Sequence, residues 1–127
     1  MIRILVIDDD IKIREMLKQY LERAEYEVLV APDGKAALKL HSANPVDLII
    51  TDIVMPEKDG LETIMELRRR FPAVKVIAIS GGGKIEANEY LDIAKAMGVT
   101  RTFSKPFELR ELLAAVRELL QILNKNT

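Results

Sequence analysis

Short apolar segments alternate with segments of helical period along this chain, and this alternation constrains its fold more than any other feature. Five runs rich in β-branched residues are candidate strands, at 4–7, 27–30, 47–51, 74–79 and 100–103. Continuous apolar runs of this length are typical of strands buried on both faces of a parallel sheet. Apolar residues at helical spacing predict a helix after each run, at 13–24, 33–42, 61–68, 87–97 and 109–123. The sequence therefore predicts an α/β fold, a doubly wound five-stranded parallel sheet with five helices.

Length, charge and cysteine content exclude several classes of protein. At 127 residues we expect one domain, 1–127, in which 121–127 form a helix end and a tail. A formal net charge of −1 argues against direct nucleic-acid binding, and the absence of cysteine excludes disulfides and Cys-ligated metals. No apolar run reaches the roughly 18 residues of a membrane span, and no secretory signal follows Met1. We therefore expect a cytoplasmic protein without a membrane partner.

Polar side chains follow four of the five candidate strands, at the point where each strand ends. They are Asp8, Asp9 and Asp10 after the first, Asp52 after the third, Ser80 with three glycines after the fourth, and Ser104 with Lys105 after the fifth. Ligands of open α/β sheets bind beyond the carboxyl ends of the strands, so we expect these side chains to meet at one edge.

Such a cluster has a specific chemistry. Neighbouring carboxylates either raise each other's pKa or require a cation, and Mg²⁺, with Mn²⁺ as the alternative, is the hard divalent ion that suits oxygen ligands together with a phosphate. A divalent ion, an amine and a hydroxyl form a phosphoryl-transfer site. A further carboxylate can act as the nucleophile and become an aspartyl phosphate.

Four motifs in this order resemble the receiver domain of two-component response regulators. They are Asp8-Asp9, Asp52 followed by Met55-Pro56 and Asp59-Gly60, Ser80-Gly81, and Lys105-Pro106-Phe107. The resemblance covers essentially the whole chain and implies a flavodoxin-like sheet with strand order 2-1-3-4-5. It also implies a signalling module that is not a classical enzyme and that catalyses only its own phosphorylation and dephosphorylation.

The resemblance assigns roles around the metal. Asp52 would accept the phosphoryl group from the phosphohistidine of a sensor kinase. Asp9 and Asp52 would bind Mg²⁺ directly, together with the main-chain carbonyl of Val54, and Asp8 would act through water.

The resemblance also assigns the groups that meet the phosphate. Lys105 and the hydroxyl of Ser80 would bind phosphoryl oxygens, and Gly81 would leave their approach open. The peptide bond that corresponds to Lys105-Pro106 is cis in the family, and a cis bond costs little free energy before proline. The partners would be a sensor histidine kinase or a histidine phosphotransfer protein, and a downstream protein target or an output domain absent from this chain.

Two positions depart from the family pattern. Thr102 occupies the position at which the family commonly has an aromatic residue that swings inward when the hydroxyl residue, here Ser80, moves. Side chains alternate between the two faces of a strand, so the neighbouring Phe103 should point to the opposite face. Val54 and Gly82 cannot orient an attacking water by hydrogen bonding, so we expect a phosphorylated state that is not unusually short-lived.

Other features have ordinary interpretations. We expect Asp10 to be an exposed or capping residue rather than a metal ligand, His41 to lie at the surface, and Arg68–Arg70 to form a solvated helix end. The glycines 81–83 do not match the spacing of a phosphate-binding P-loop, and a mobile loop between the strand at 74–79 and the helix at 87–97 is the better interpretation.

Two alternatives remain open at this point. The leucines of the last helix (109–123) fit packing against the sheet, but their spacing also fits a heptad seam that would form a homodimer or continue into an output domain. The alternative function is a Mg²⁺-dependent phosphohydrolase of the haloacid dehalogenase type, which also forms an aspartyl phosphate; its nucleophile motif would begin at Asp8, but Lys12 stands where it has Thr or Val.

Overall fold

The computed structural model describes residues 2–53, 60–80, 92 and 98–125. Its strands are β1 (Arg3–Ile7), β2 (Glu27–Ala31), β3 (Leu48–Asp52), β4 (Lys75–Ser80) and β5 (Arg101–Ser104). Its helices are α1 (Ile11–Arg23), α2 (Gly34–Ala43), α3 (Gly60–Arg70) and α5 (Leu109–Lys125). The helix predicted at 87–97 falls, except for residue 92, outside the described residues, which hold four of the five expected helices.

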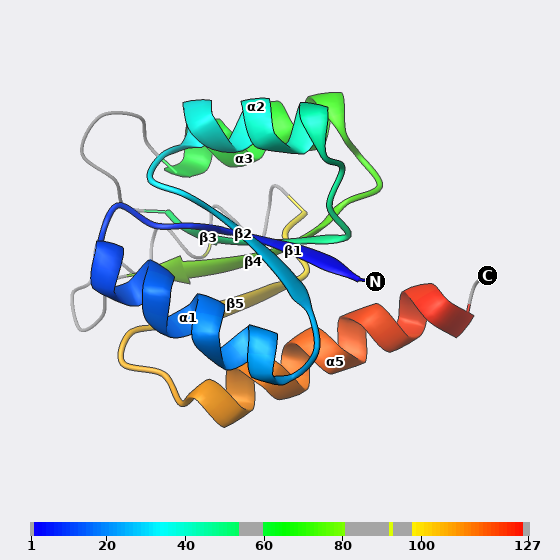
Figure 1. Ribbon diagram of the computed structural model, residues 1–127. Helices are drawn as coiled ribbons and strands as arrows, with labels where there is room; N and C mark the ends of the chain where they lie inside the picture. The colour runs from blue at the N-terminus through cyan, green and yellow to red at the C-terminus, as the bar shows by residue number, and fades with distance from the viewer. Residues whose placement is uncertain (1, 54–59, 81–91, 93–97, 126–127) are drawn as a thin grey trace.

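The five strands form one parallel sheet in the order β2-β1-β3-β4-β5. Helices α2 and α3 cover one face of this sheet and α1 and α5 cover the other, as Figure 1 shows. The flavodoxin-like order that the resemblance implied is therefore confirmed. The strand order reverses between β1 and β3, where such sheets bind their ligands.

Four strands end one residue later than the apolar runs indicated, at Ala31, Asp52, Ser80 and Ser104. The main-chain hydrogen bonds continue past the apolar residues: the N–H of Ile53 donates to the carbonyl of Ile79 at 2.9 Å, and the N–H of Lys105 to that of Ser80 at 2.8 Å. The polar residues at these strand ends are thus held by the sheet itself.

Each face of the sheet has its own hydrophobic core, because successive strand residues point to opposite faces. The core under α2 and α3 includes Leu5, Ile7, Ile49, Val76, Ala78, Ile64 and Leu67. The core under α1 and α5 includes Ile4, Val6, Ile50, Ile77, Ile79, Leu17, Leu21, Leu112 and Val116. This double burial explains why the strands read as continuous apolar runs.

Two helices begin at aspartates that cap them. The side chain of Asp10 accepts from the N–H of Lys12 at the start of α1, and that of Asp33 accepts from the N–H of Ala36 at the start of α2, both at 2.9 Å. Such caps satisfy N–H groups that have no partner within the helix. The capping interpretation of Asp10 is confirmed.

His41 is buried, so its predicted place at the surface is wrong. It continues the sheet-facing stripe of α2 and is 4% exposed. Its Nδ1 accepts from the N–H of Val46 at 3.0 Å, and its ring meets that of Phe71 edge-on at 4.1 Å between centroids. The segments before β3 and after α3 are therefore joined through one imidazole.

Arg68 also departs from expectation. Its Nη1 donates to the carbonyl of Val74 at 2.9 Å, because the chain turns back beneath α3 before β4. Arg69 and Arg70 are exposed. The predicted solvated helix end is thus right for the last two arginines and wrong for the first.

The described part of the stripe on α5 packs on the sheet. Leu112, Val116 and Leu119 are buried in the core that α5 shares with α1, so these side chains are not open to a second chain.

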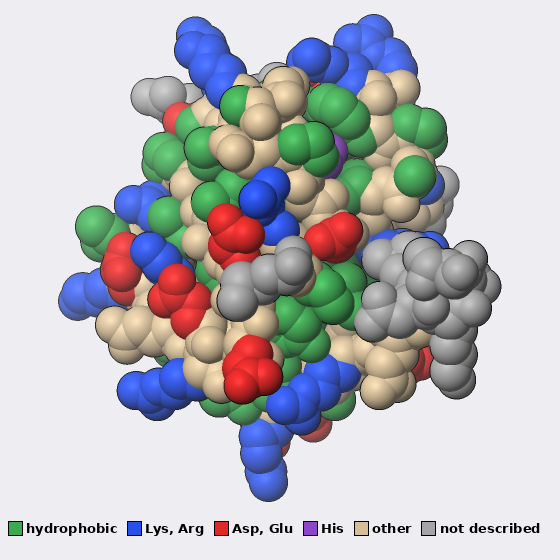
Figure 2. Space-filling model, turned by 45° about the vertical axis from the view of Figure 1, so that its right-hand side comes forward, with side chains coloured by type: hydrophobic (Ala, Val, Ile, Leu, Met, Phe, Trp, Pro, Cys, Tyr) green, Lys and Arg blue, Asp and Glu red, His purple; other side chains and the backbone are tan. Residues whose placement is uncertain are grey.

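Among the described residues, no helix has both the length and the hydropathy that crossing a membrane requires. On the face drawn in Figure 2, acidic side chains lie mostly near the centre and basic side chains mostly around the edge.

Candidate functional site

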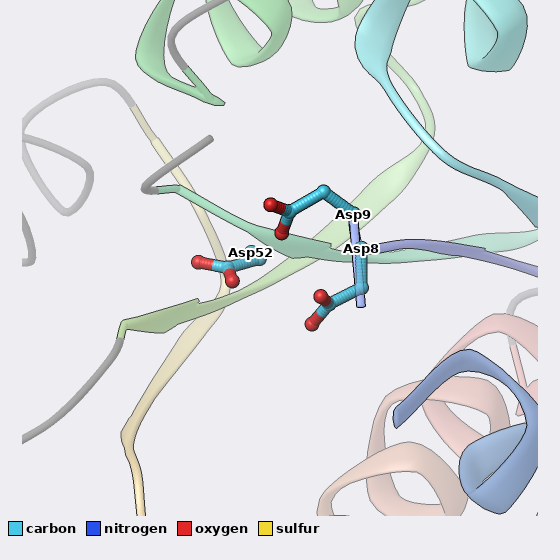
Figure 3. Close-up of side chains that lie close together, drawn as sticks. All are labelled: Asp8, Asp9 and Asp52. Atoms are coloured by element: carbon cyan, nitrogen blue, oxygen red, sulfur yellow. The ribbon is translucent and has the colours of Figure 1, made fainter. Parts of the chain in front are cut away.

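Three carboxylates meet at the carboxyl ends of β1 and β3. Asp8 and Asp9 directly follow β1, and Asp52 is the last residue of β3. One carboxylate oxygen from each lies within 4.8 Å of the other two, and Figure 3 shows the three side chains at the rim of the sheet. Asp8 and Asp52 are 2% and 6% exposed, whereas Asp9 is exposed. The cluster therefore opens to solvent on the side of Asp9.

Lys105 brings one positive charge to this cluster from the end of β5. Its Nζ donates to Oδ2 of Asp52 at 3.1 Å and to Oδ2 of Asp8 at 3.3 Å. Its own N–H is bonded to the strand end at Ser80, and the peptide bond to Pro106 is cis, as the resemblance implied. Residues more than fifty positions apart thus share one ion-pair network.

Burial and charge act in opposite directions on these groups. Burial raises the pKa of Asp8, and the hydrogen bond from Asp10 and the charge of Lys105 offset this only in part. Burial alone would lower the pKa of Lys105, but the charges of Asp52 and Asp8 outweigh it, so its pKa is raised and the ammonium stays charged. Within the described part of the chain one ammonium faces three carboxylates, so the ionised cluster carries an excess of negative charge and attracts cations.

The donor set fits a small hard cation. Mg²⁺ binds oxygen ligands at about 2.1 Å, so ligands on opposite sides of the ion lie about 4.2 Å apart. Carboxylate oxygens that all lie within 4.8 Å of one another can enter such a shell with little movement.

The two neighbouring aspartates of the cluster are not equivalent. Oδ1 of Asp8 accepts from the N–H of Asp10 at 2.9 Å, while its Oδ2 accepts from Lys105. Each oxygen of Asp8 thus already accepts a hydrogen bond, whereas the carboxylate of Asp9 is exposed to solvent.

Ser80 ends β4 at the same edge of the sheet. It is 0% exposed, and its Oγ has no hydrogen-bond partner in the described part of the chain. A buried hydroxyl without a partner carries a desolvation penalty of about 1–3 kcal/mol. A ligand oxygen that reached this hydroxyl would remove the penalty.

Other candidate residues are placed differently or not at all. Val54, Gly81 and Gly82 lie outside the described residues. Thr102 is half-buried and pairs in register with Ala78. Phe103 packs in the core under α1 and α5, on the face opposite to Thr102, as strand alternation predicted.

Arg14 is a contact that the sequence analysis missed. Its Nη1 donates to the main-chain carbonyl of Asp8 at 2.9 Å. Side chains in a helix lean toward its N-terminus, so a long side chain in the first turn of α1 reaches the preceding loop. That position was the available signal.

Comparison with known proteins agrees with the fold and the strand-end motifs. The family described as "Response regulator receiver domain" matches residues 4–117. The transcriptional regulatory protein CpxR of Klebsiella pneumoniae is 35% identical over 119 residues, which cover 94% of this chain and 49% of that protein. The response regulator MprA of Mycolicibacterium vanbaalenii is 36% identical over 121 residues, covering 94% and 51%. The chain thus spans about half the length of the curated relatives it matches.

Solved structures show the same likeness. A CheY-like receiver domain protein from Methanospirillum hungatei JF-1 superposes with a TM-score of 0.89 at 28% identity and covers 100% of this chain and 99% of that one. The response regulator TrrA of Thermotoga maritima, crystallised with Mg²⁺ and BeF, has a TM-score of 0.82 at 34% identity and covers 94% and 99%. The comparisons give no support to the phosphohydrolase alternative. From the sheet order, the acidic cluster with its lysine and these matches together, this chain belongs to the response regulator receiver domain family.

Proposed function

We propose that this chain is the phosphoacceptor of a two-component system, and that it takes a phosphoryl group from a phosphohistidine onto Asp52 in a Mg²⁺-dependent reaction. The donor would be a sensor histidine kinase or a histidine phosphotransfer protein. The chain would act as a signalling module whose own chemistry is limited to gaining and losing this phosphoryl group.

One observation carries the proposal: the Lys105 ammonium contacts Asp52 and Asp8 at once, beside the open carboxylate of Asp9. A phosphoryl group transferred here brings additional negative charge, which the site must neutralise. The ammonium supplies part of that charge, and a bound Mg²⁺ would supply the rest and orient the phosphoryl oxygens.

In the reaction, a carboxylate oxygen of Asp52 attacks phosphorus. The new P–O bond forms as the bond between phosphorus and the imidazole nitrogen breaks, and that nitrogen keeps the electron pair and takes a proton from solvent. The Lys105 ammonium, which donates to Oδ2 of Asp52 before the reaction, would then donate to a phosphoryl oxygen. The buried Ser80 hydroxyl is the second donor for these oxygens.

When the Ser80 hydroxyl binds a phosphoryl oxygen, its movement at the end of β4 would couple phosphorylation to the surface next to β4 and β5. Thr102 lies one strand away from Ser80 and is not an aromatic residue, so this coupling would run through a smaller side chain than is usual in the family. The relatives are about twice as long as this chain and one is named a transcriptional regulatory protein. The recipient of the signal would be a further domain or a separate protein.

The test is phosphorylation by acetyl phosphate, followed by intact mass, with Mg²⁺ and with EDTA. We expect one phosphoryl group on the parent with Mg²⁺ and none in EDTA or on Asp52→Asn. Asp10→Asn is the matched control, because asparagine also caps helices and the change removes a neighbouring carboxylate outside the ion-pair network; it should be phosphorylated like the parent. Labelling of Asp52→Asn at the parent's rate, or labelling that EDTA does not affect, would overturn the proposal.

A further inference from the structure

Arg14 ties the first turn of α1 to the acidic loop that precedes it. The residue is half-buried, and its N–H bonds to the carbonyl of Asp10 at 3.1 Å, so the helix holds the base of its side chain. From there the side chain runs back past the start of α1, and Nη1 donates to the carbonyl of Asp8 at 2.9 Å.

The carbonyl that Arg14 holds belongs to the peptide group joining Asp8 to Asp9. Because a peptide group is planar, a bond to its oxygen also restrains the position from which the Asp9 side chain starts. The flanking groups are held too: the N–H of Asp8 donates to the carbonyl of Ala31 at 3.2 Å, and the N–H of Asp10 to Oδ1 of Asp8 at 2.9 Å.

Asp9 depends on this restraint more than its neighbours do. Asp8 and Asp52 are buried and bonded to Lys105, whereas Asp9 is exposed, so little packing limits its rotation. Figure 3 shows its side chain leaving the end of β1 and turning toward the side of Asp52. The direction of this carboxylate is therefore set largely by the backbone beneath it.

We infer that Arg14 is a positioning residue for the metal site: by holding the Asp8–Asp9 peptide, it aims the Asp9 carboxylate at the position of the cation before the cation binds. This inference rests on the proposed function. Partners of ligand-bearing groups are known to influence metal affinity strongly even though they do not touch the ion.

Charge and positioning predict opposite effects for the loss of Arg14. The guanidinium is always positive, so through charge alone it repels a cation, and its removal would tighten Mg²⁺ binding. Through positioning, its removal leaves Asp9 free to point elsewhere and weakens Mg²⁺ binding. The sign of the change therefore separates the two roles.

The experiment measures the Mg²⁺ dissociation constant of the unphosphorylated protein by calorimetry with MgCl₂, and thermal unfolding in EDTA. Arg14→Met removes the hydrogen bond, and we expect a dissociation constant about tenfold higher than that of the parent. Lys12→Met is the matched control: it removes the same charge from the same turn, from an exposed side chain, and should leave the constant unchanged or slightly lower. Should Arg14→Met fail to fold in EDTA, Arg14→Lys, which keeps the charge but not the planar fork, should show a smaller loss in the same direction.

The outcomes also separate this inference from the proposed function. If the parent does not bind Mg²⁺, or if Asp52→Asn binds it as tightly as the parent, both proposals fail. If the parent's binding depends on Asp52 but Arg14→Met binds as tightly as the parent or more tightly, only the role of Arg14 fails. A lower unfolding temperature of Arg14→Met with an unchanged dissociation constant would show a purely structural role.

Discussion

Replacing Lys105 with methionine removes an ammonium that contacts both buried carboxylates of the site. Nζ of Lys105 lies 3.1 Å from Oδ2 of Asp52 and 3.3 Å from Oδ2 of Asp8, and its side chain is 23% exposed. Methionine keeps much of the apolar stem, so the change isolates the charge. We expect a less stable fold, because Asp8 and Asp52 keep their burial and lose their counter-charge.

The size of the effect follows from the burial of the pair. Removing one partner of a buried ion pair costs about 3–5 kcal/mol. Because Lys105 is partly exposed to solvent, the lower end applies, about 3 kcal/mol. Unfolding entropy is about 2.1 cal/mol/K per residue, or about 0.27 kcal/mol/K for 127 residues, so the unfolding temperature should fall by about 11 °C.

The assay is thermal unfolding at pH 7, first in EDTA and then with saturating Mg²⁺. We expect the full decrease in EDTA and a smaller one with Mg²⁺, because the divalent ion supplies the missing positive charge and stabilises the folded state on binding. Lys12→Met, at an exposed position, should stay within about 2 °C of the parent. If Lys105→Met unfolds within that same margin in EDTA, the reasoning is refuted.

Three further predictions concern packing, pH and the lifetime of the phosphorylated state. A Cβ at Gly34 would overlap the side chain of Thr63, so Gly34→Ala should destabilise the protein by about 2 kcal/mol in denaturant unfolding. Adding Thr63→Ala should recover part of this loss. A stabilising Gly34→Ala would contradict the close packing of α2 and α3. Burial lowers the pKa of His41 below its ordinary value of 6.5. The stability that neutral His41 contributes is therefore fully present above pH 6.5 and is lost as the pH falls toward the folded-state pKa, because the unfolded chain takes up the proton at a higher pH than the folded chain. Unfolding midpoints measured from pH 7.5 to 5.5 should show this slope in the parent but not in His41→Asn, whose side chain offers the N–H of Val46 an oxygen acceptor. Val54→Asn introduces an amide able to orient water two residues after Asp52, so its acyl phosphate should decay several-fold faster than that of the parent when followed by intact mass, and equal or slower decay would count against this reasoning.

The sequence alone supports the strands, most helices and the chemistry at the strand ends. β1 and β3 are predictable because burial on both faces requires continuous apolar runs, a local property of the chain. The capping roles of Asp10 and Asp33 are equally local, since each cap bonds within three residues. The strand-end rule also names the residues of the cluster, because carboxyl ends of parallel strands share one edge.

Strand order and exact element ends were not contained in local pattern. The order 2-1-3-4-5 came from the family resemblance, because an apolar run carries no mark of which strand it will pair with. The later ends of β3 and β4, at Asp52 and Ser80, depend on main-chain bonds to a neighbouring strand. Main-chain hydrogen bonds do not depend on side-chain hydrophobicity, so the strands extend one residue beyond the apolar runs.

The tertiary structure alone decided how individual polar side chains are used. His41 is buried because Phe71, thirty residues away, covers its ring, and Arg68 turns inward because the chain brings the carbonyl of Val74 beneath it. In the site, only the assembled sheet could show that Lys105 bonds both Asp8 and Asp52, and only the folded helix α1 shows that Arg14 reaches the carbonyl of Asp8. A polar group is satisfied by whichever partner the folded chain brings within hydrogen-bond distance, and for these residues that partner is distant in sequence or reached only through the helix geometry.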